Sequence, residues 1–338
     1  MNYPPLLPGI VDPIEFARFD PHYIYGGTSS YVAMQKLLNR NERERLIGAG
    51  SLEAAETVLK ETFLGKYLHA DSNVESALQA SLKSVKHSLE QSVPTKHLTN
   101  ILFLRYDFYN LKILLKLPKE ALDDPETTSR LSPLGLHSAQ TLIKAVVTKN
   151  TADLHPELAR ALSAAEKEAK QLDNYLECRY LLAARGEAEA SGKKFALRYV
   201  TLLTNLFAII AGLRSHARGM EAPHPEFLPF SLKELTDPEA LLKRLSRIGW
   251  SKHWSDAVTL YREEKDFSIL DKAMDDFIMK WIKRQAIQID SAAPYFAYWH
   301  VMRENVAFVR AVMTAHKVGL PEKTLRNIIR TSYSAYVY

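Results

Sequence analysis

The stretch "RYDFYNLKILLK", residues 105–116, decides the fold of this chain. Together with Leu104 just before it, its residues Phe108, Leu111 and Leu115 recur at spacings of three and four, the period of one face of an α-helix. The same helix carries Asp107, Asn110 and Lys112 near its middle. A buried amide is tolerated only when it is hydrogen-bonded. We therefore predict that Asn110 is buried and bonded to the backbone of a neighbouring segment, with contact to a partner protein as the alternative.

Asn110 marks the first of three similar helical stretches. Asn205 lies 95 positions later, in "YVTLLTNLFAIIAGLR", and Asn305 another 100 positions on, in "WHVMRENVAFVRAVM". Apolar residues keep one register around each Asn, six positions before it (Leu104, Tyr199, Trp299), one after (Leu111, Leu206, Val306) and four after (Leu114, Ile209, Val309). A fixed repeat period predicts repeated structural units, here of roughly 100 residues. Three such units can close around a pseudo-threefold axis.

The remaining patterning is helical throughout. Five of the 16 prolines fall in residues 1–27, which we interpret as an extended arm. Repeats are predicted at 28–120, 121–222 and 223–338, with proline-bearing linkers at 118–135 and 221–230.

One helix is expected from Ser29 until Gly48 and Gly50 end it. Ser51 and Asp237 are expected to cap later helices, the second with Pro238 at its first position. Because no alternating strand with hairpin turns appears, the predicted fold class is all-α.

Composition restricts the function. Of 338 residues, 46% are hydrophobic and 25% charged, a globular balance, and the net charge is +5 with a pI near 9.0. Basic and acidic residues are interleaved rather than segregated, which disfavours a nucleic-acid face. The one cysteine, Cys178, cannot form an internal disulfide, fits a reducing compartment and is expected to be a small buried side chain.

The N-terminus lacks the charged and apolar regions of a signal peptide. The most apolar stretch, 202–213, has 12 residues, fewer than the about 20 needed to cross a bilayer. No direct membrane insertion is expected.

Catalytic motifs are missing from the sequence. There is no P-loop, and the only G-x-G, at 48–50, reads as a helix stop. The acidic pairs at 123–124 and 275–276 do not make D-D-x-x-D, and the 11 histidines form no metal-ligand pattern. We therefore expect no catalytic residue, cofactor or metal.

Four segments resemble the C subunit family of V/A-type ATPases, whose eukaryotic counterpart is subunit d. "YDFYNLKILLK" resembles that family's Asp-x-x-Asn-Leu-Lys helix. "YVAMQKLL" (31–38), "SLEAAETVLKETFLGKYL" (51–68) and "ENVAFVRAVMTAHKVGLPEKTLRNII" (304–329) are similar to its first helix, its Glu-rich helix and its closing segment. The resemblance spans about residues 25–329 and is carried by the order and spacing of the segments.

The chain also departs from the family pattern. The basic residue two positions after Asn is Lys112 in the first repeat but Phe207 and Ala307 in the others, and the Arg usual in the first helix is replaced near Val32. Interface residues are therefore not carried over from the family.

The resemblance implies a funnel of three similar helical domains without a catalytic site. Such a subunit sits on the cytoplasmic face of the membrane proteolipid ring and receives the central stalk, built from D- and F-type subunits, so that rotation is coupled to ion transport. The alternative is an α-helical adaptor or scaffold unrelated to an ATPase; an all-α enzyme is the third hypothesis.

Lys112, Lys116, Arg214 and Arg310 stand beside the Asn register and are the predicted contacts to the stalk. The alternative is that these cations extend into ordinary solvent.

Overall fold

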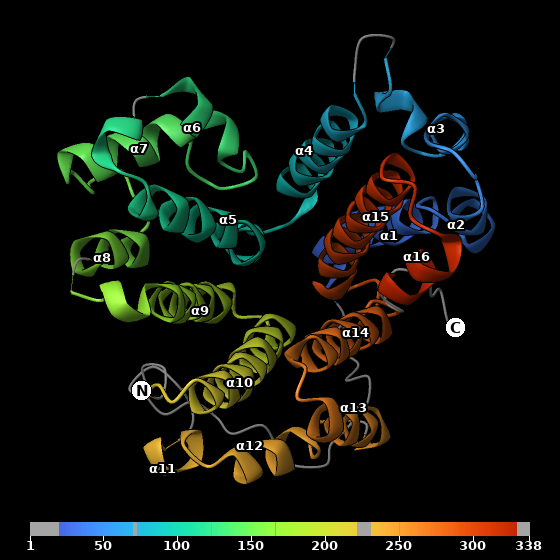
Figure 1. Cartoon of the computed structure of the whole chain (residues 1–338). Coiled ribbons are helices and arrows are strands. Elements are labelled where there is room, and N and C mark those ends of the chain that lie inside the picture. Colours follow the sequence, from blue (N-terminus) through green and yellow to red (C-terminus); the bar gives the residue numbers. More distant parts are fainter. Residues whose placement is uncertain are drawn as a thin grey trace. The chain divides into compact units, whose positions relative to one another are not determined.

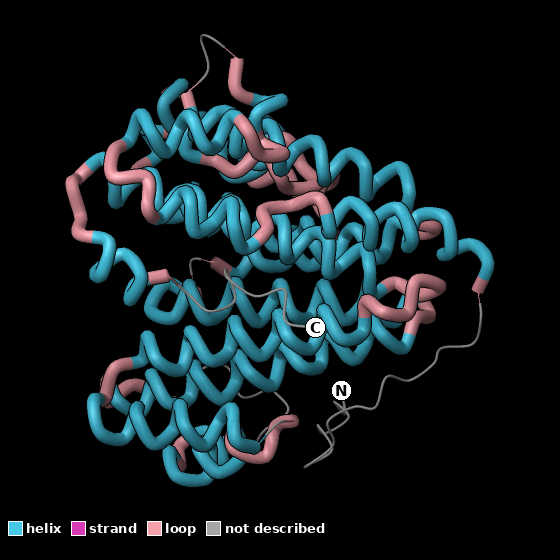
Figure 2. Tube along the Cα trace, turned by 90° about the vertical axis from the view of Figure 1, so that its right-hand side faces the viewer, coloured by secondary structure: helices cyan, strands magenta, loops and turns pink. Residues whose placement is uncertain are grey.

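The computed structural model of the chain describes residues 20–69, 73–122, 124–165, 167–221, 231–249 and 251–329. Within these ranges the backbone forms helices, turns and loops, and no strand (Figure 2). The prediction of an all-α fold is confirmed.

The chain divides into two compact units, with boundaries at Pro94/Thr95 and Leu270/Asp271. Unit one, residues 95–270, holds α5 (Lys96–Lys116), α6 (Pro125–Arg130), α7 (Ala139–Thr148), α8 (Pro156–Ala164), α9 (Leu172–Ser191), α10 (Lys194–Ala217), α11 (Leu232–Leu235), α12 (Pro238–Leu245), α13 (Ser251–Glu264) and the short 3-10 turns η2 (Lys119–Ala121) and η3 (Ala169–Gln171).

Unit two, residues 20–94 and 271–329, holds α1 (Pro21–Gln35), α2 (Arg40–Ile47), α3 (Leu52–Lys60), the 3-10 turn η1 (Gly65–Tyr67), α4 (Val74–Ser92), α15 (Ala293–Lys317) and α16 (Glu322–Ile328). The boundary itself falls inside α14 (Phe267–Gln285).

The core of unit one is a layer of adjacent helices. The helix α9 packs against α5, α8 and α10, while α5 also contacts α7 and α10 contacts α12 (Figure 1). Tyr180 of α9 contacts α5 in two ways. Its hydroxyl donates to the Ile101 carbonyl over 3.2 Å, and its ring packs edge-on against Phe108 with 6.1 Å between the ring centres. The stretch 105–116 thus lies in the helix around which this unit is built.

The helix α10 contains the apolar stretch that the sequence analysis counted as 12 residues. It is 24 residues long, and among the described residues it is the one helix long and apolar enough to cross a membrane. However, 72% of its most apolar window is buried against the rest of the protein, as in the core helix of a globular domain. The helix is longer than the apolar stretch 202–213 because it continues at both ends, over residues 194–201 and 214–217.

Unit two is closed by helices from distant parts of the sequence. The 25-residue helix α15 packs against α1, α3 and α4. The Tyr295 hydroxyl lies 3.4 Å from the carbonyls of both Tyr23 and Ser92. Gly27 permits the close approach of the α14–α15 loop, because a Cβ there would stand 2.0 Å from the Ile289 carbonyl oxygen.

Two expectations for the beginning of the chain were wrong. Residues 21–27 are helical rather than part of an extended arm, because Asp20 caps α1 by accepting from the His22 N–H and Pro21 occupies the first turn. The single helix expected from Ser29 to Gly48 is divided in two, because Asn39 and Glu42 form a capping box that starts α2. Residues 1–19 of the predicted arm lie outside the described residues.

Other local signals were confirmed. Ser51 caps α3, and Asp237 caps α12 with Pro238 in its first turn. The linker at 118–135 contains η2 and α6, while most of the linker at 221–230 lies outside the described residues. The division into repeats at 28–120, 121–222 and 223–338, and their threefold relation, remain predictions.

Candidate interface site

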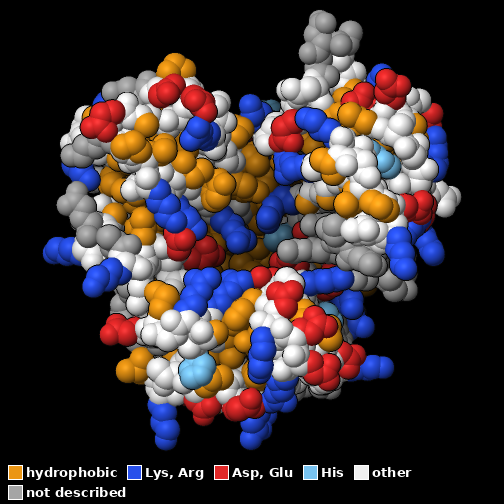
Figure 3. Space-filling model, in the orientation of Figure 1, with side chains coloured by type: hydrophobic (Ala, Val, Ile, Leu, Met, Phe, Trp, Pro, Cys, Tyr) orange, Lys and Arg blue, Asp and Glu red, His pale blue; other side chains and the backbone are white. Residues whose placement is uncertain are grey.

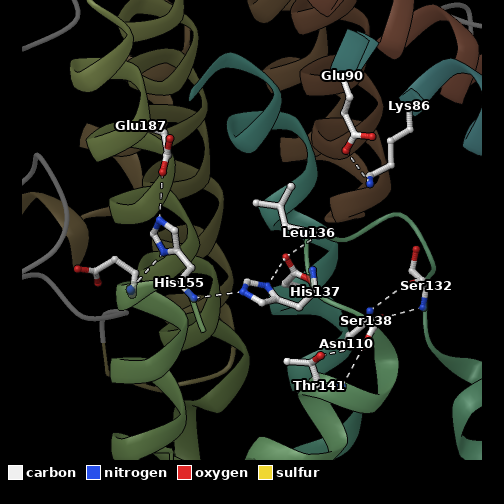
Figure 4. Close-up of polar contacts among 12 residues, drawn as sticks. Lys86, Glu90, Asn110, Ser132, Leu136, His137, Ser138, Thr141, His155 and Glu187 are labelled. Atoms are coloured by element: carbon white, nitrogen blue, oxygen red, sulfur yellow. Dashed lines mark hydrogen bonds and ion pairs between the residues drawn. The ribbon is translucent and has the colours of Figure 1, made fainter. Parts of the chain in front are cut away.

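Asn110 ties α5 to the segment that follows α6. Its side chain is fully buried (0% exposed), its Nδ2 donates to the Ser132 carbonyl over 2.8 Å, and its Oδ1 accepts from the Ser132 N–H over 2.7 Å (Figure 4). The prediction of a buried Asn110 bonded to backbone is confirmed. Because its amide is used within unit one, Asn110 acts as a structural anchor.

The other two asparagines are also buried, and each donates to a carbonyl of its own helix; for Asn305 this is the Nδ2 bond to the Val301 carbonyl over 2.7 Å. The Asn305 Oδ1 accepts from the Leu38 N–H over 3.0 Å, so it joins α15 to the segment between α1 and α2. The Asn205 Nδ2 donates to the Thr201 carbonyl in its own helix over 2.8 Å. The structural equivalence of the three residues stays a prediction.

Asp107 holds the same loop as Asn110, one turn earlier on α5. Its carboxylate is fully buried and accepts from the N–H groups of Leu136, over 2.9 Å, and His137, over 3.1 Å. The His137 Nδ1 lies 3.1 Å from the Asp107 Oδ2. Gly135 is required by this approach, since a Cβ there would stand 2.1 Å from the Asp107 Oδ1.

A second polar cluster surrounds Glu187 on α9. Its carboxylate oxygens lie 2.7 Å from His97 Nδ1, 3.1 Å from Asn100 Nδ2 and 3.2 Å from His155 Nε2. Burial alone would raise the pKa of Glu187, but the hydrogen bonds from His155, His97 and Asn100 outweigh it and lower that pKa. The ionised carboxylate therefore accepts from all three side chains.

The Glu187 cluster is unsuited to a metal ion. Figure 4 shows His155 between Glu187 and His137, and its Nδ1 accepts the Glu157 N–H over 3.2 Å. The proton of neutral His155 is therefore on Nε2, the nitrogen that faces Glu187, whereas a metal ligand needs a free lone pair there. Within the described ranges no group of three His, Cys, Asp or Glu side chains is placed to hold a metal. The sequence did not indicate this cluster, because its members are about 30 to 90 positions apart.

Two of the predicted interface cations meet on one acid. Lys112 Nζ lies 3.1 Å from Asp173 Oδ2, and Lys116 Nζ lies 2.6 Å from Asp173 Oδ1. Burial would raise the pKa of Asp173, but the hydrogen bonds from Lys116 and Lys112 lower it overall. All three side chains remain between about one third and one half exposed, so the cluster joins α5 to α9 at the surface.

The other two predicted cations lie apart from that cluster. The Arg214 guanidinium carbon stands 5.6 Å above the centre of the Phe267 ring, within unit one. Arg310 belongs to unit two and donates two hydrogen bonds to the Glu75 carboxylate, from Nε to Oε2 over 2.9 Å and from Nη2 to Oε1 over 2.7 Å. The structure thus brings Lys112 and Lys116 together and gives each of the four cations a partner within its own unit.

A cavity of about 640 Å³ opens beside the Lys112–Lys116–Asp173 cluster. It lies where α5 ends, α9 begins and α10 ends, and we call it the α5/α9/α10 groove. Its lining includes the cations Lys116, Lys170 and Arg218 and the apolar Leu115, Leu172 and Met220. Lys170 and Arg218 were missed in the sequence, because a turn residue and a residue after a helix end have no periodic signal.

The visible surface carries charges of both signs. Figure 3 shows Lys and Arg interspersed with Asp and Glu and with hydrophobic side chains over the face displayed. This mixed surface agrees with the interleaved charges of the sequence.

The chain belongs to the ATP synthase (C/AC39) subunit family, whose model matches residues 31–328. The match includes all three asparagine-bearing helices. Among curated proteins, none matches this sequence. Family membership makes the chain a subunit of a V/A-type ATPase and favours that reading over an unrelated adaptor.

Proposed function

We propose that this chain is a non-catalytic subunit of the central rotor of a V/A-type ATPase. In this role it is a socket between the central stalk, with its D- and F-type subunits, and the membrane proteolipid ring, and it couples rotation to ion transport. The observation that carries the proposal is the family match over 31–328, which spans most of the chain.

Buried hydrogen bonds in the cores of the two units support a mechanical role. In unit one, Asn110 and Asp107 fix the loop after α6 to α5 by four hydrogen bonds to backbone groups. In unit two, Asn305 joins α15 to the segment between α1 and α2. Buried polar groups that are fully hydrogen-bonded rigidify a core, and a part that passes torque must be rigid.

Lys112, Lys116, Arg214 and Arg310 are the proposed contacts to the stalk. Each is partly or largely exposed, and charges at the rim of an interface steer and orient a partner. Their internal partners Asp173 and Glu75 hold three of them in fixed positions, which lowers the entropy cost of a further contact. The proposed location is the cytoplasmic face of the membrane, reached through the complex.

Calorimetry with the purified stalk pair tests the proposal. Wild-type protein should bind the stalk pair, and binding should weaken as salt is added. The variant K112A/K116A/R214A/R310A should remain folded by circular dichroism, since exposed ion pairs contribute little to stability, and it should bind more weakly. If wild-type protein bound neither the stalk pair nor detergent-solubilised ring, the socket role would be excluded. If the variant bound the stalk pair with the same affinity as wild type at low salt, only the assignment of these four residues to the interface would fail.

A further inference from the structure

The α5/α9/α10 groove has the size and the lining of a protein-binding site. Its volume of about 640 Å³ lies within the range of about 300–1,000 Å³ typical of pockets that bind ligands, and it is large enough to admit side chains of a partner segment. It lies entirely within unit one and is built from the ends of α5, α9 and α10 and from the segment between α8 and α9.

The groove is positively charged on balance. Lys116, Lys170 and Arg218 line it together with one acid, Asp173. That acid is already shared by Lys116 and by Lys112 from outside the lining, so its charge is compensated. Lys170 and Arg218, both exposed, thus line the groove with no acid of the lining left to balance them.

Beside these cations the groove offers an apolar surface and a hydrogen-bond acceptor. Met220 is 44% exposed, and Leu115 and Leu172 also contribute to the lining. The Gln171 Oε1 is buried and has no hydrogen-bond partner among the described residues. A peptide N–H can satisfy such an acceptor, whereas a bare inorganic anion cannot.

We propose that the α5/α9/α10 groove binds an acidic segment of another subunit of the ATPase. Carboxylates of that segment pair with Lys170 and Arg218, an apolar side chain packs against Met220, and a backbone N–H donates to Gln171. The identity of the partner as an ATPase subunit rests on the proposed function. Arginine suits this task because its planar guanidinium binds a carboxylate through two parallel hydrogen bonds.

The first test places a photo-crosslinking amino acid at Met220 in the intact complex purified from native membranes. The expected product joins this position to an Asp- or Glu-rich segment of another subunit, identified by mass spectrometry. A crosslink to lipid or nucleic acid alone, a crosslink to a segment without acidic residues, or no crosslink would overturn the proposal.

The second test reverses charge in the groove. K170E/R218E is compared with K243E/R247E, which makes the same charge change at exposed residues of unit one outside the lining. Membrane complexes stripped of the chain are titrated with each protein. The groove variant should bind about tenfold more weakly and the control should match wild type, because truncating or reversing paired charges chiefly weakens the bound state. Changing acids of the crosslinked segment to Lys should restore binding of K170E/R218E.

The outcomes separate this inference from the proposed function. If wild-type chain failed to rebind stripped complexes, the proposed function itself would fail. If wild-type chain rebound and K170E/R218E bound equally well, only the groove assignment would fail. If K170E/R218E did not fold, as judged by circular dichroism, the groove assignment would be tested by the crosslink from Met220 alone.

Discussion

Replacing Asn110 with alanine tests whether the mid-helix amide of the decisive stretch is a structural anchor. The change removes both hydrogen bonds to Ser132 and leaves that residue's N–H and C=O without their partner. A net contribution of about 1 kcal/mol for each bond gives a loss of about 2 kcal/mol in the free energy of unfolding. For a unit of this size that corresponds to a fall of about 4–8 °C in the melting temperature.

Asn205→Ala is the matched control. Asn205 is the same residue type, is equally buried, and lies in the middle of a helix of the same unit, but it donates to a carbonyl of its own helix. That carbonyl keeps its helical N–H partner after the change, and alanine favours the helix, so the expected loss is below about 1 kcal/mol.

Urea unfolding and amide hydrogen exchange measure the two effects. Asn110→Ala should lower stability more than Asn205→Ala, and the amide of Ser132, in the loop after α6, should lose protection in Asn110→Ala only, because its N–H donates to Asn110. Equal stability losses in the two variants, or unchanged protection of that loop, would refute the assignment of Asn110 as the anchor.

Three further outcomes are expected. The pKa of Glu187 is lowered from 4.5, so its ionised form stabilises the fold above about pH 4.5. That contribution is lost as the pH falls through the pKa of the folded state. In urea unfolding, the difference in stability between wild type and Glu187→Gln should therefore shrink from about pH 6 to about pH 3. Gly27→Ala should destabilise by about 1–3 kcal/mol, since its Cβ would meet the Ile289 carbonyl, whereas Gly186→Ala in α9, with open space at its Cβ, should be neutral or stabilising in thermal melts. Arg310→Ala should cost under about 1 kcal/mol in the same melts, because its ion pair is half exposed.

Local sequence signals predicted several of the helix ends. Ser51 and Asp237 were predicted as caps because an oxygen that accepts from the first turn's N–H groups is a property of the cap and its immediate neighbours. The division between α1 and α2 was missed even though Asn39 and Glu42 have capping-box spacing, because the apolar stripe continues across the break.

Tertiary partners were only partly predictable. The burial of Asn110 followed from its place on an apolar helix, but its partner Ser132 lies 22 residues away in a loop. The pairing of Lys112 and Lys116 with Asp173 depends on the contact between α5 and α9, which no local pattern specifies. Lys170 and Arg218 join the same groove only because a turn and a helix end meet there.

The central claim is that this chain couples rotation to ion transport within a V/A-type ATPase. The most direct measurement compares ATP hydrolysis and ATP-driven ion uptake in reconstituted vesicles whose complexes contain, lack or have regained the chain. Complexes without it should still hydrolyse ATP but should not accumulate ions, and adding the purified chain back should restore uptake. Full ion uptake by complexes that lack the chain would contradict the account.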